Sequence, residues 1–288
     1  MAEIRQIERR GFTIEDPQEA GRIVRGKIAL PEGTEKEGHE LPYVLVLHGF
    51  KGFMDWGFFP ELVTRLVLRG IAVVSFNFSG SGVGEDPCEI SEDEAFFNNT
   101  PSREVEDVGR VRAWIEARGL PGIDPARCAI FGHSLGGAVA FLHAAVRRDY
   151  RAVVVWAPIG DFARRRGDVA KWREQGYSEI TNGRTGQVHR LGVGWLNDVE
   201  NNASTLDISK ACGRLSTPTL ICHGREDEAV PLKEVEMLYR AFQPDVARFL
   251  AIADTGHTFG AKHPLTEVGV DLETVLSETV ETFATHLL

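Results

Sequence analysis

Short apolar runs alternate with longer helical periodicities along most of the chain, and this alternation restricts the fold more than any other feature. The apolar runs are rich in β-branched residues, continuous rather than alternating, and bounded by Gly or Pro. Strands that are buried on both faces of a parallel sheet show this pattern. We therefore expect strands over 43–49, 71–78, 128–134, 152–158, 219–224 and 247–253.

The segments between these runs carry helix start and stop signals. Ser102 is a plausible N-cap and Gly119 a plausible end of one helix, Pro231 opens another, and 264–288 predicts a last one. Helices placed between strands indicate βαβ units and an α/β fold with a doubly wound, mostly parallel sheet. The first 35 residues predict an antiparallel hairpin on one edge of this sheet.

Residues 161–207 interrupt the alternation, and no strand is predicted there. About 45 residues are too many for an ordinary connection, and such segments are usually functional or disordered. Aromatic side chains make disorder the weaker interpretation. We expect a core of residues 1–160 and 208–288 and a lid insertion over 161–207, with its aromatics at Phe162, Trp172, Tyr177 and Trp195.

The charge of the chain excludes several classes of partner. The formal net charge is -10 at pH 7 over 288 residues, which disfavours nucleic acid and anionic membrane surfaces. The basic run Arg164–Arg166 is interpreted as solvated surface. The first residues are charged and lack the apolar segment of a signal peptide, and no stretch reaches the ~18 apolar residues of a membrane helix. A cytoplasmic protein is the expectation.

Cofactor and metal motifs are weak. Cys88, Cys128, Cys212 and Cys222 have neither CxxC spacing nor a Cys/His ligand pattern, so we predict no metal site, and buried thiols at Cys128 and Cys222. The glycine-rich Ser79–Gly84 does not have the spacing of a dinucleotide fingerprint, and acidic residues follow it instead of a helix. No cofactor is predicted.

Ser134 lies in Gly132-His133-Ser134-Leu135-Gly136, a G-x-S-x-G motif that follows an apolar run and precedes a helical one. A nucleophile elbow requires this context, because the serine occupies a strained strand-to-helix turn whose neighbours must be small. The helix that begins there directs its first amides at the serine. We therefore predict that Ser134 is a nucleophile.

At these residues the sequence resembles the α/β-hydrolase superfamily, and it is similar to small-lid bacterial feruloyl or cinnamoyl esterases. The resemblance covers the chain from about Leu41 onward and rests on "HGF", "GHSLGG", "HGREDEAVP" and "DTGHTF", each of which follows a predicted strand. The lid insertion lies at the family's lid position. The resemblance implies a serine carboxylesterase with a Ser-His-Asp triad.

A serine hydroxyl needs a base, and in this fold the acid and then the histidine follow the nucleophile along the chain. His257 follows the last predicted strand and is the preferred base, with His263 and His286 as later competitors. Asp227 is the preferred acid, since it lies between a strand and the helix start at Pro231. Its acidic neighbours Glu226 and Glu228, and Asp161 after an earlier strand, stay open.

The resemblance also implies the remaining parts of the site. The backbone amides of Leu135 and Phe50 are expected to form the oxyanion hole, and Phe162, Trp172, Tyr177 and Trp195 either line an acyl pocket or pack the lid onto the core. The predicted substrate is a small-molecule ester. A peptidase, a thioesterase and a ligand receptor without catalysis remain alternatives, and the sequence does not indicate an oligomeric state.

Overall fold

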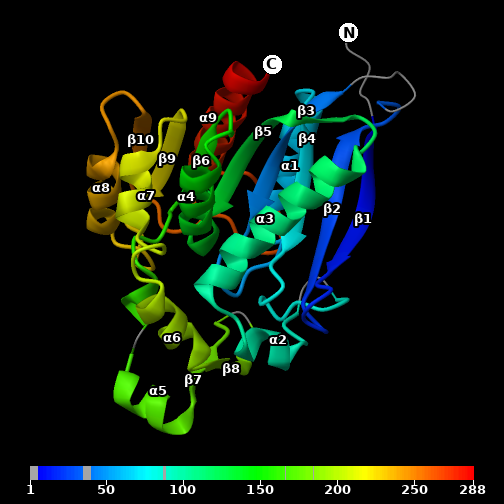
Figure 1. Cartoon of the computed structure of the whole chain (residues 1–288). Helices are drawn as coiled ribbons and strands as arrows, with labels where there is room; N and C mark the ends of the chain where they lie inside the picture. Colours follow the sequence, from blue (N-terminus) through cyan, green and yellow to red (C-terminus); the bar gives the residue numbers. More distant parts are fainter. Residues whose placement is uncertain (1–5, 35–39, 87–88, 166, 184) are drawn as a thin grey trace.

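The predicted strands lie side by side in one eight-stranded sheet (Figure 1). The computed structural model describes residues 6–34, 40–86, 89–165, 167–183 and 185–288. The spatial order is β1-β2-β4-β3-β5-β6-β9-β10, and every pair is parallel except β1–β2 and β2–β4. The strands are β1 (Ile7–Glu15), β2 (Ile23–Pro31), β3 (Leu41–Leu47), β4 (Ala72–Asn77), β5 (Ile123–His133), β6 (Val153–Trp156), β9 (Thr219–Gly224) and β10 (Ala247–Ile252). The doubly wound sheet and the N-terminal edge hairpin are thus confirmed.

Helices cover both faces of the sheet (Figure 1). One face packs on α1 (Phe59–Leu68) and α9 (Val270–Leu287). The other packs on α3 (Pro101–Arg118), α4 (Leu135–Arg147), α7 (Ile208–Arg214) and α8 (Leu232–Ala241). Successive strand residues alternate between these two cores. This two-faced burial explains why the strands are apolar without a break.

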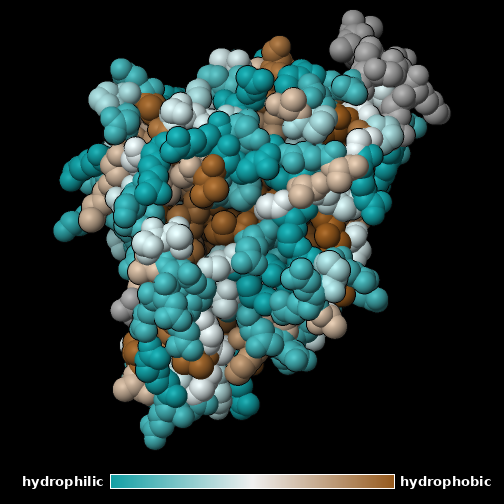
Figure 2. Space-filling view, viewed as in Figure 1, coloured by the Kyte–Doolittle hydropathy of each residue, from teal (hydrophilic) through white to brown (hydrophobic). Residues whose placement is uncertain are grey.

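Helix α4 is buried on all sides for most of its length, which its apolar sequence requires. It packs between α3 and α7. Figure 2 shows apolar atoms gathered in the furrow over α4, while hydrophilic side chains cover much of the surrounding face. The helix that follows Ser134 is therefore part of the core.

The segment 161–207 contains two strands, so the expectation of no strand there was wrong. It comprises the 3-10 helix η1 (Phe162–Arg165), α5 (Val169–Gln175), β7 (Tyr177–Thr181), β8 (Val188–Gly192) and α6 (Gly194–Asn201). Strands β7 and β8 form a separate two-stranded sheet, in which β8 lies beside the short α2 (Asp93–Phe97) (Figure 1). Because these strands are short and partly exposed, they lack the continuous apolar run of the buried strands.

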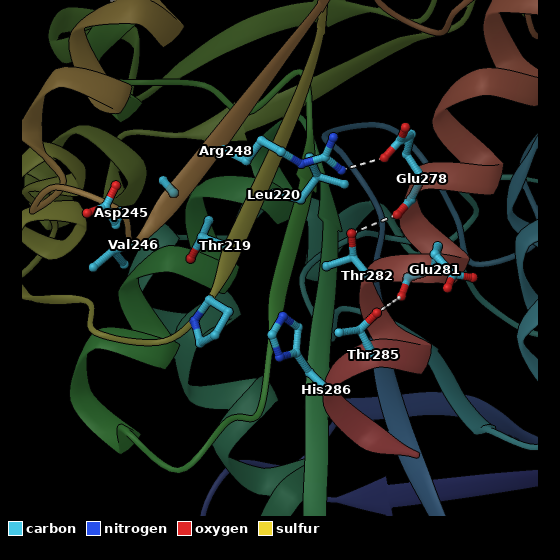
Figure 3. Close-up of a pocket in the computed structure, with 12 residues that line it drawn as sticks. Thr219, Leu220, Asp245, Val246, Arg248, Glu278, Glu281, Thr282, Thr285 and His286 are labelled. Atoms are coloured by element: carbon cyan, nitrogen blue, oxygen red, sulfur yellow. Dashed lines mark hydrogen bonds and ion pairs between the residues drawn. The ribbon is translucent and has the colours of Figure 1, made fainter.

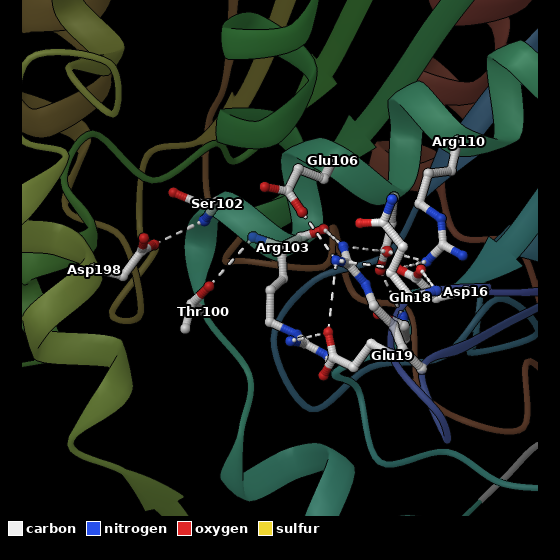
Figure 4. Close-up of polar contacts among 12 residues, drawn as sticks. Asp16, Gln18, Glu19, Thr100, Ser102, Arg103, Glu106, Arg110 and Asp198 are labelled. Atoms are coloured by element: carbon white, nitrogen blue, oxygen red, sulfur yellow. Dashed lines mark hydrogen bonds and ion pairs between the residues drawn. The ribbon is translucent and has the colours of Figure 1, made fainter.

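Two helix starts also differ from prediction. Helix α3 is capped by Thr100, whose hydroxyl accepts a hydrogen bond from the amide of Arg103. The amide of Ser102 instead donates to Asp198 of α6 (Figure 4). Helix α9 begins at Val270 and not at Pro264, although Leu265 and Val268 pack on the same core. Leu265 and Val268 thus extend the apolar pattern of α9 toward the N-terminus, although their backbone is not helical.

The described residues contain no helix long and apolar enough to cross a membrane. Cys128 and Cys222 are buried free thiols, as expected, and Cys88 lies outside the described residues.

A buried ion pair ties the hairpin β1–β2 to α3. Arg22 Nη2 lies 3.0 Å from Asp107 Oδ1, and the Asp107 side chain is completely buried. The other oxygen of Asp107 accepts a hydrogen bond of 2.7 Å from the amide of Ser79, just after β4. Nearby, Arg103 pairs with Glu19 at the surface (Figure 4).

Replacing Arg22 with methionine is expected to lower the free energy of unfolding by about 3 kcal/mol, because the buried Asp107 carboxylate loses its closest cation. Urea unfolding of both proteins measures the difference. Arg103→Met is the matched control, since it removes a more exposed ion pair and should cost less than about 1 kcal/mol. Equal losses of unfolding free energy in Arg22→Met and Arg103→Met would contradict a stabilising role of the buried Arg22–Asp107 pair.

Candidate active site

Ser134 sits in a strained turn between β5 and α4. Its backbone has φ 56 and ψ -116, a conformation that L residues rarely adopt. A Cβ on Gly132 would lie 2.2 Å from the carbonyl oxygen of Gly136, and one on Gly136 would lie 2.5 Å from that of His48. Only glycine fits at these two positions, so the motif's glycines are needed for this turn.

The turn at Ser134 leads directly into α4, which begins at Leu135. The first four amides of a helix have no partner within it, and the helix dipole is positive at this end. Leu135 is the first helical residue, so its amide belongs to this group. On the other side lies Gly49, whose Cβ would be 3.1 Å from the Cβ of Ser134. The backbone after β3 thus approaches the serine closely.

His257 and Asp227 form a hydrogen-bonded pair in this region. His257 Nδ1 is 2.7 Å from Asp227 Oδ2, and the second carboxylate oxygen of Asp227 accepts the amides of Ala229 and Val230, each at 2.8 Å. The carboxylate therefore determines which imidazole nitrogen carries the proton, namely Nδ1. His257 Nε2 is left as a proton acceptor.

Burial raises the pKa of Asp227, but the hydrogen bond and charge of His257 and the amide of Val230 outweigh it, so the pKa falls below its ordinary value. The acid is ionised at neutral pH. Its competitors lie elsewhere: Glu226 and Glu228 are exposed, and Asp161 is exposed and accepts the amide of Ala163.

His133 supports the loop of His257 rather than the serine. Its Nε2 donates to the carbonyl oxygen of His257 at 3.0 Å, and the two rings lie 4.7 Å apart. Burial and the nearby imidazole lower the pKa of His133 to about 3. It is therefore neutral near pH 7, and its ring nitrogen is engaged with backbone. The later histidines also lie outside the pair: His263 Nδ1 accepts the amide of Gly57, and His286 belongs to the opposite end of the sheet.

His48 holds the peptide that joins Gly49 and Phe50. Its Nε2 accepts the amide of Phe78 at 3.2 Å, so its Nδ1 carries the proton and donates to the carbonyl of Gly49 at 2.8 Å. Burial lowers the pKa of His48 to about 4, which keeps the ring neutral. In a trans peptide the next amide points away from that carbonyl. The amide of Phe50 is thereby turned away from His48.

A cavity of about 200 Å³ opens beside Ser134 and His257. None of the four lid aromatics predicted for a pocket is among its described lining residues. Phe162, Trp172 and Trp195 are buried. Tyr177 lies under the Arg190 guanidinium. Trp195 makes an edge contact with Phe50, ring centres 5.7 Å apart, so it packs the segment 161–207 onto the loop after β3.

The cavity is lined by residues that the sequence did not single out. Besides Ser134, His257, His133 and Phe50, it is lined by Gly49, Lys51, Gly52, Trp56, Phe59, Asn182 and Thr258. Lys51 and Trp56 follow Phe50 closely, so their proximity to the predicted oxyanion residue was an available signal. Asn182 had no such signal, because it reaches the cavity only through the folding of the β7–β8 hairpin.

A larger hollow of about 570 Å³ lies at the opposite end of the sheet, between β9, β10 and α9 (Figure 3). Several of its polar groups are bonded within the fold: Arg248 pairs with Glu278, and Thr282 and Thr285 donate to backbone carbonyls of α9. It opens at the amino ends of the parallel strands, whereas active sites of open α/β sheets form at the carboxyl ends. Within the described part of the chain, no cluster of three metal-binding side chains is found.

The sheet order, the serine turn between strand and helix and the His–Asp pair at the carboxyl ends of the strands define an α/β hydrolase. The chain belongs to the prolyl oligopeptidase family (peptidase family S9), whose model matches residues 56–277.

Two curated relatives each share 27% identity with this chain over the matched residues. The acylamino-acid-releasing enzyme of Sus scrofa is 27% identical over 272 residues, which cover 90% of this chain and 33% of that enzyme. An uncharacterised Mycobacterium tuberculosis protein is 27% identical over 216 residues, 75% of this chain and 63% of that protein. The chain thus spans less than two thirds of the length of these relatives.

Solved structures share the fold at low identity. A putative hydrolase from Agrobacterium vitis superposes with a TM-score of 0.73 at 18% identity, covering 97% of this chain and 100% of that one. Ferulic acid-bound Est1E from Butyrivibrio proteoclasticus gives 0.66 at 20% identity, covering 92% and 97%.

Proposed function

We propose that this protein hydrolyses carboxylic esters of small molecules through an acyl-enzyme on Ser134. The observation that carries the proposal is the His257–Asp227 hydrogen bond beside the cavity that Ser134 also lines. His257 Nε2 takes the proton of the Ser134 hydroxyl as its oxygen attacks the ester carbonyl carbon. Asp227 stabilises the imidazolium that results.

The negative charge on the carbonyl oxygen is then stabilised by backbone amides. The amide of Leu135 at the start of α4 and that of Phe50 are the proposed donors. His257 returns the proton to the leaving alkoxide, and the alcohol departs. Water, activated by His257, attacks the acyl carbon. The carboxylic acid product leaves while Ser134 regains its proton from His257.

Peptide hydrolysis is the second candidate, because the family is a peptidase family and a matched relative is named for releasing acylamino acids. A p-nitrophenyl ester series from acetate to decanoate, methyl ferulate and acetyl-alanine p-nitroanilide separates the two. A cavity of about 150 Å³ holds one benzene molecule, so the cavity of about 200 Å³ beside Ser134 has room for a short acyl group. We therefore expect kcat/KM to be highest for short acyl groups. A higher kcat/KM for the anilide would favour the peptidase. Failure to turn over any of these compounds would overturn both.

His48 is proposed to act as a positioning residue for the oxyanion amide of Phe50. Replacing it with alanine should lower kcat about 10- to 100-fold with little change in KM, because the amide contributes mainly to the transition state. The control is His143→Ala, which removes another buried histidine bonded to Tyr150 between α3 and α4. That variant should lose stability but keep its kcat. A rise in KM alone for His48→Ala would contradict the proposed role.

A further inference from the structure

Two segments far apart in the sequence meet at the rim of the active-site cavity. Lys51 follows the proposed oxyanion residue, and Asn182 lies at the end of β7 in the lid; both line the cavity. Lys51 Nζ donates a hydrogen bond of 2.9 Å to the carbonyl of Thr181. This bond holds the ammonium group beside Asn182, which is itself 5% exposed.

The described lining of the cavity contains a basic side chain and no acidic one, although the protein is strongly negative. The chain has a net charge of -10, yet the described residues that line this cavity include Lys51 and no carboxylate. Asp227, the nearby acid, lies behind His257 with its side chain fully buried. The amino end of α4 adds the positive end of a helix dipole. The electrostatics therefore favour a ligand group with negative charge.

We propose that this site selects short esters that carry a carboxylate a few bonds from the ester carbonyl, with Lys51 as the specificity-determining residue. The inference rests on the proposed ester hydrolysis and names its substrate class. The cavity of about 200 Å³ limits the group that bears the carboxylate to a short chain. The carboxylate belongs to either the acid or the alcohol part of the ester, and both are tested.

Two isosteric pairs separate charge from shape. Monomethyl glutarate and methyl 5-methylhexanoate differ by a carboxylate against an isopropyl group on the acid side. Acetoxyacetate and isobutyl acetate differ in the same way on the alcohol side. In at least one pair the charged ester should have the higher kcat/KM. The ratio of charged to neutral kcat/KM should fall about tenfold in Lys51→Met, the loss expected for one charge-assisted contact.

Matched variants distinguish an effect of the Lys51 charge from an effect of its hydrogen bond to the carbonyl of Thr181. Lys51→Arg should keep the ratio, and both replacements place a non-glycine side chain at the same φ of 59. Lys262→Met removes an exposed lysine whose backbone lies near Gly57 and should leave the ratio unchanged. The wild-type ratio should also fall as NaCl rises from about 0.05 to about 0.5 M, because salt screens the attraction.

Equal ratios in the wild type and Lys51→Met for both pairs would overturn the inference. A binding test keeps it separate from the proposed reaction. The Ser134→Ala variant should bind monomethyl glutarate and acetoxyacetate with a Kd that rises about tenfold on adding Lys51→Met. If the wild type turned over no ester but this binding difference were found, ester hydrolysis would fail while the anion preference stood. Binding without that difference would remove the anion preference.

Discussion

Replacing Ser134 with alanine should lower kcat for ester hydrolysis by a factor on the order of a million, which is the loss seen when a triad serine is removed. Without the hydroxyl no acyl-enzyme forms, and His257 has no nucleophile to deprotonate. The oxyanion amides and the cavity stay in place, so a residual rate of about a thousandfold over water is expected. Steady-state hydrolysis of p-nitrophenyl acetate measures the loss.

Alanine keeps the Cβ of serine, so the strained turn at φ 56 is preserved and the variant should fold. The thermal unfolding midpoint checks this point. A fluorophosphonate should phosphonylate the Ser134 oxygen in the wild type, with loss of fluoride and the serine proton as HF, and leave the variant unlabelled. Ser178→Ala, on β7 of the lid, is the control serine and should retain full activity. Activity within tenfold of wild type in a folded Ser134→Ala protein would exclude the serine as nucleophile.

Replacing Asp227 with asparagine should lower kcat about 10⁴-fold, through the wrong imidazole tautomer. One oxygen of Asp227 accepts the amides of Ala229 and Val230, so the asparagine carbonyl must occupy that side. Its NH₂ group then faces His257 Nδ1 and donates to it. This forces the proton onto Nε2, which can no longer accept the proton of Ser134.

The matched controls are the neighbours in sequence. Glu226→Gln and Glu228→Gln remove charges from exposed positions on either side of Asp227 and should change kcat less than about twofold. If either control lost as much activity as Asp227→Asn, the acid would be misassigned. A proton shift of the His257 ring from Nδ1 to Nε2, observed by NMR, would support the tautomer mechanism directly.

The sequence alone predicted the strands of the main sheet, the edge hairpin and the turn at Ser134. These features depend on short segments: a strand buried on both faces must be apolar throughout, and the turn needs glycine two residues before and after the serine. The preference for Asp227 and His257 followed from chain order. The structure distinguishes Asp227 from Glu226 and Glu228, because Asp227 contacts the imidazole of His257 and the two glutamates are exposed.

Tertiary structure decided what surrounds these residues. The hairpin β7–β8 was not predicted, because its short, half-exposed strands carry no distinctive pattern. The place of Asn182 in the cavity depends on how that hairpin packs against α2 and the loop after β3. Phe162, Trp172 and Trp195 are buried packing groups, and Trp195 packs against Phe50 of the loop after β3. Short segments of the sequence were enough to predict the fold and the proposed nucleophile. The wall of the cavity and its charge depend on contacts between segments far apart in the sequence, which no short segment predicts.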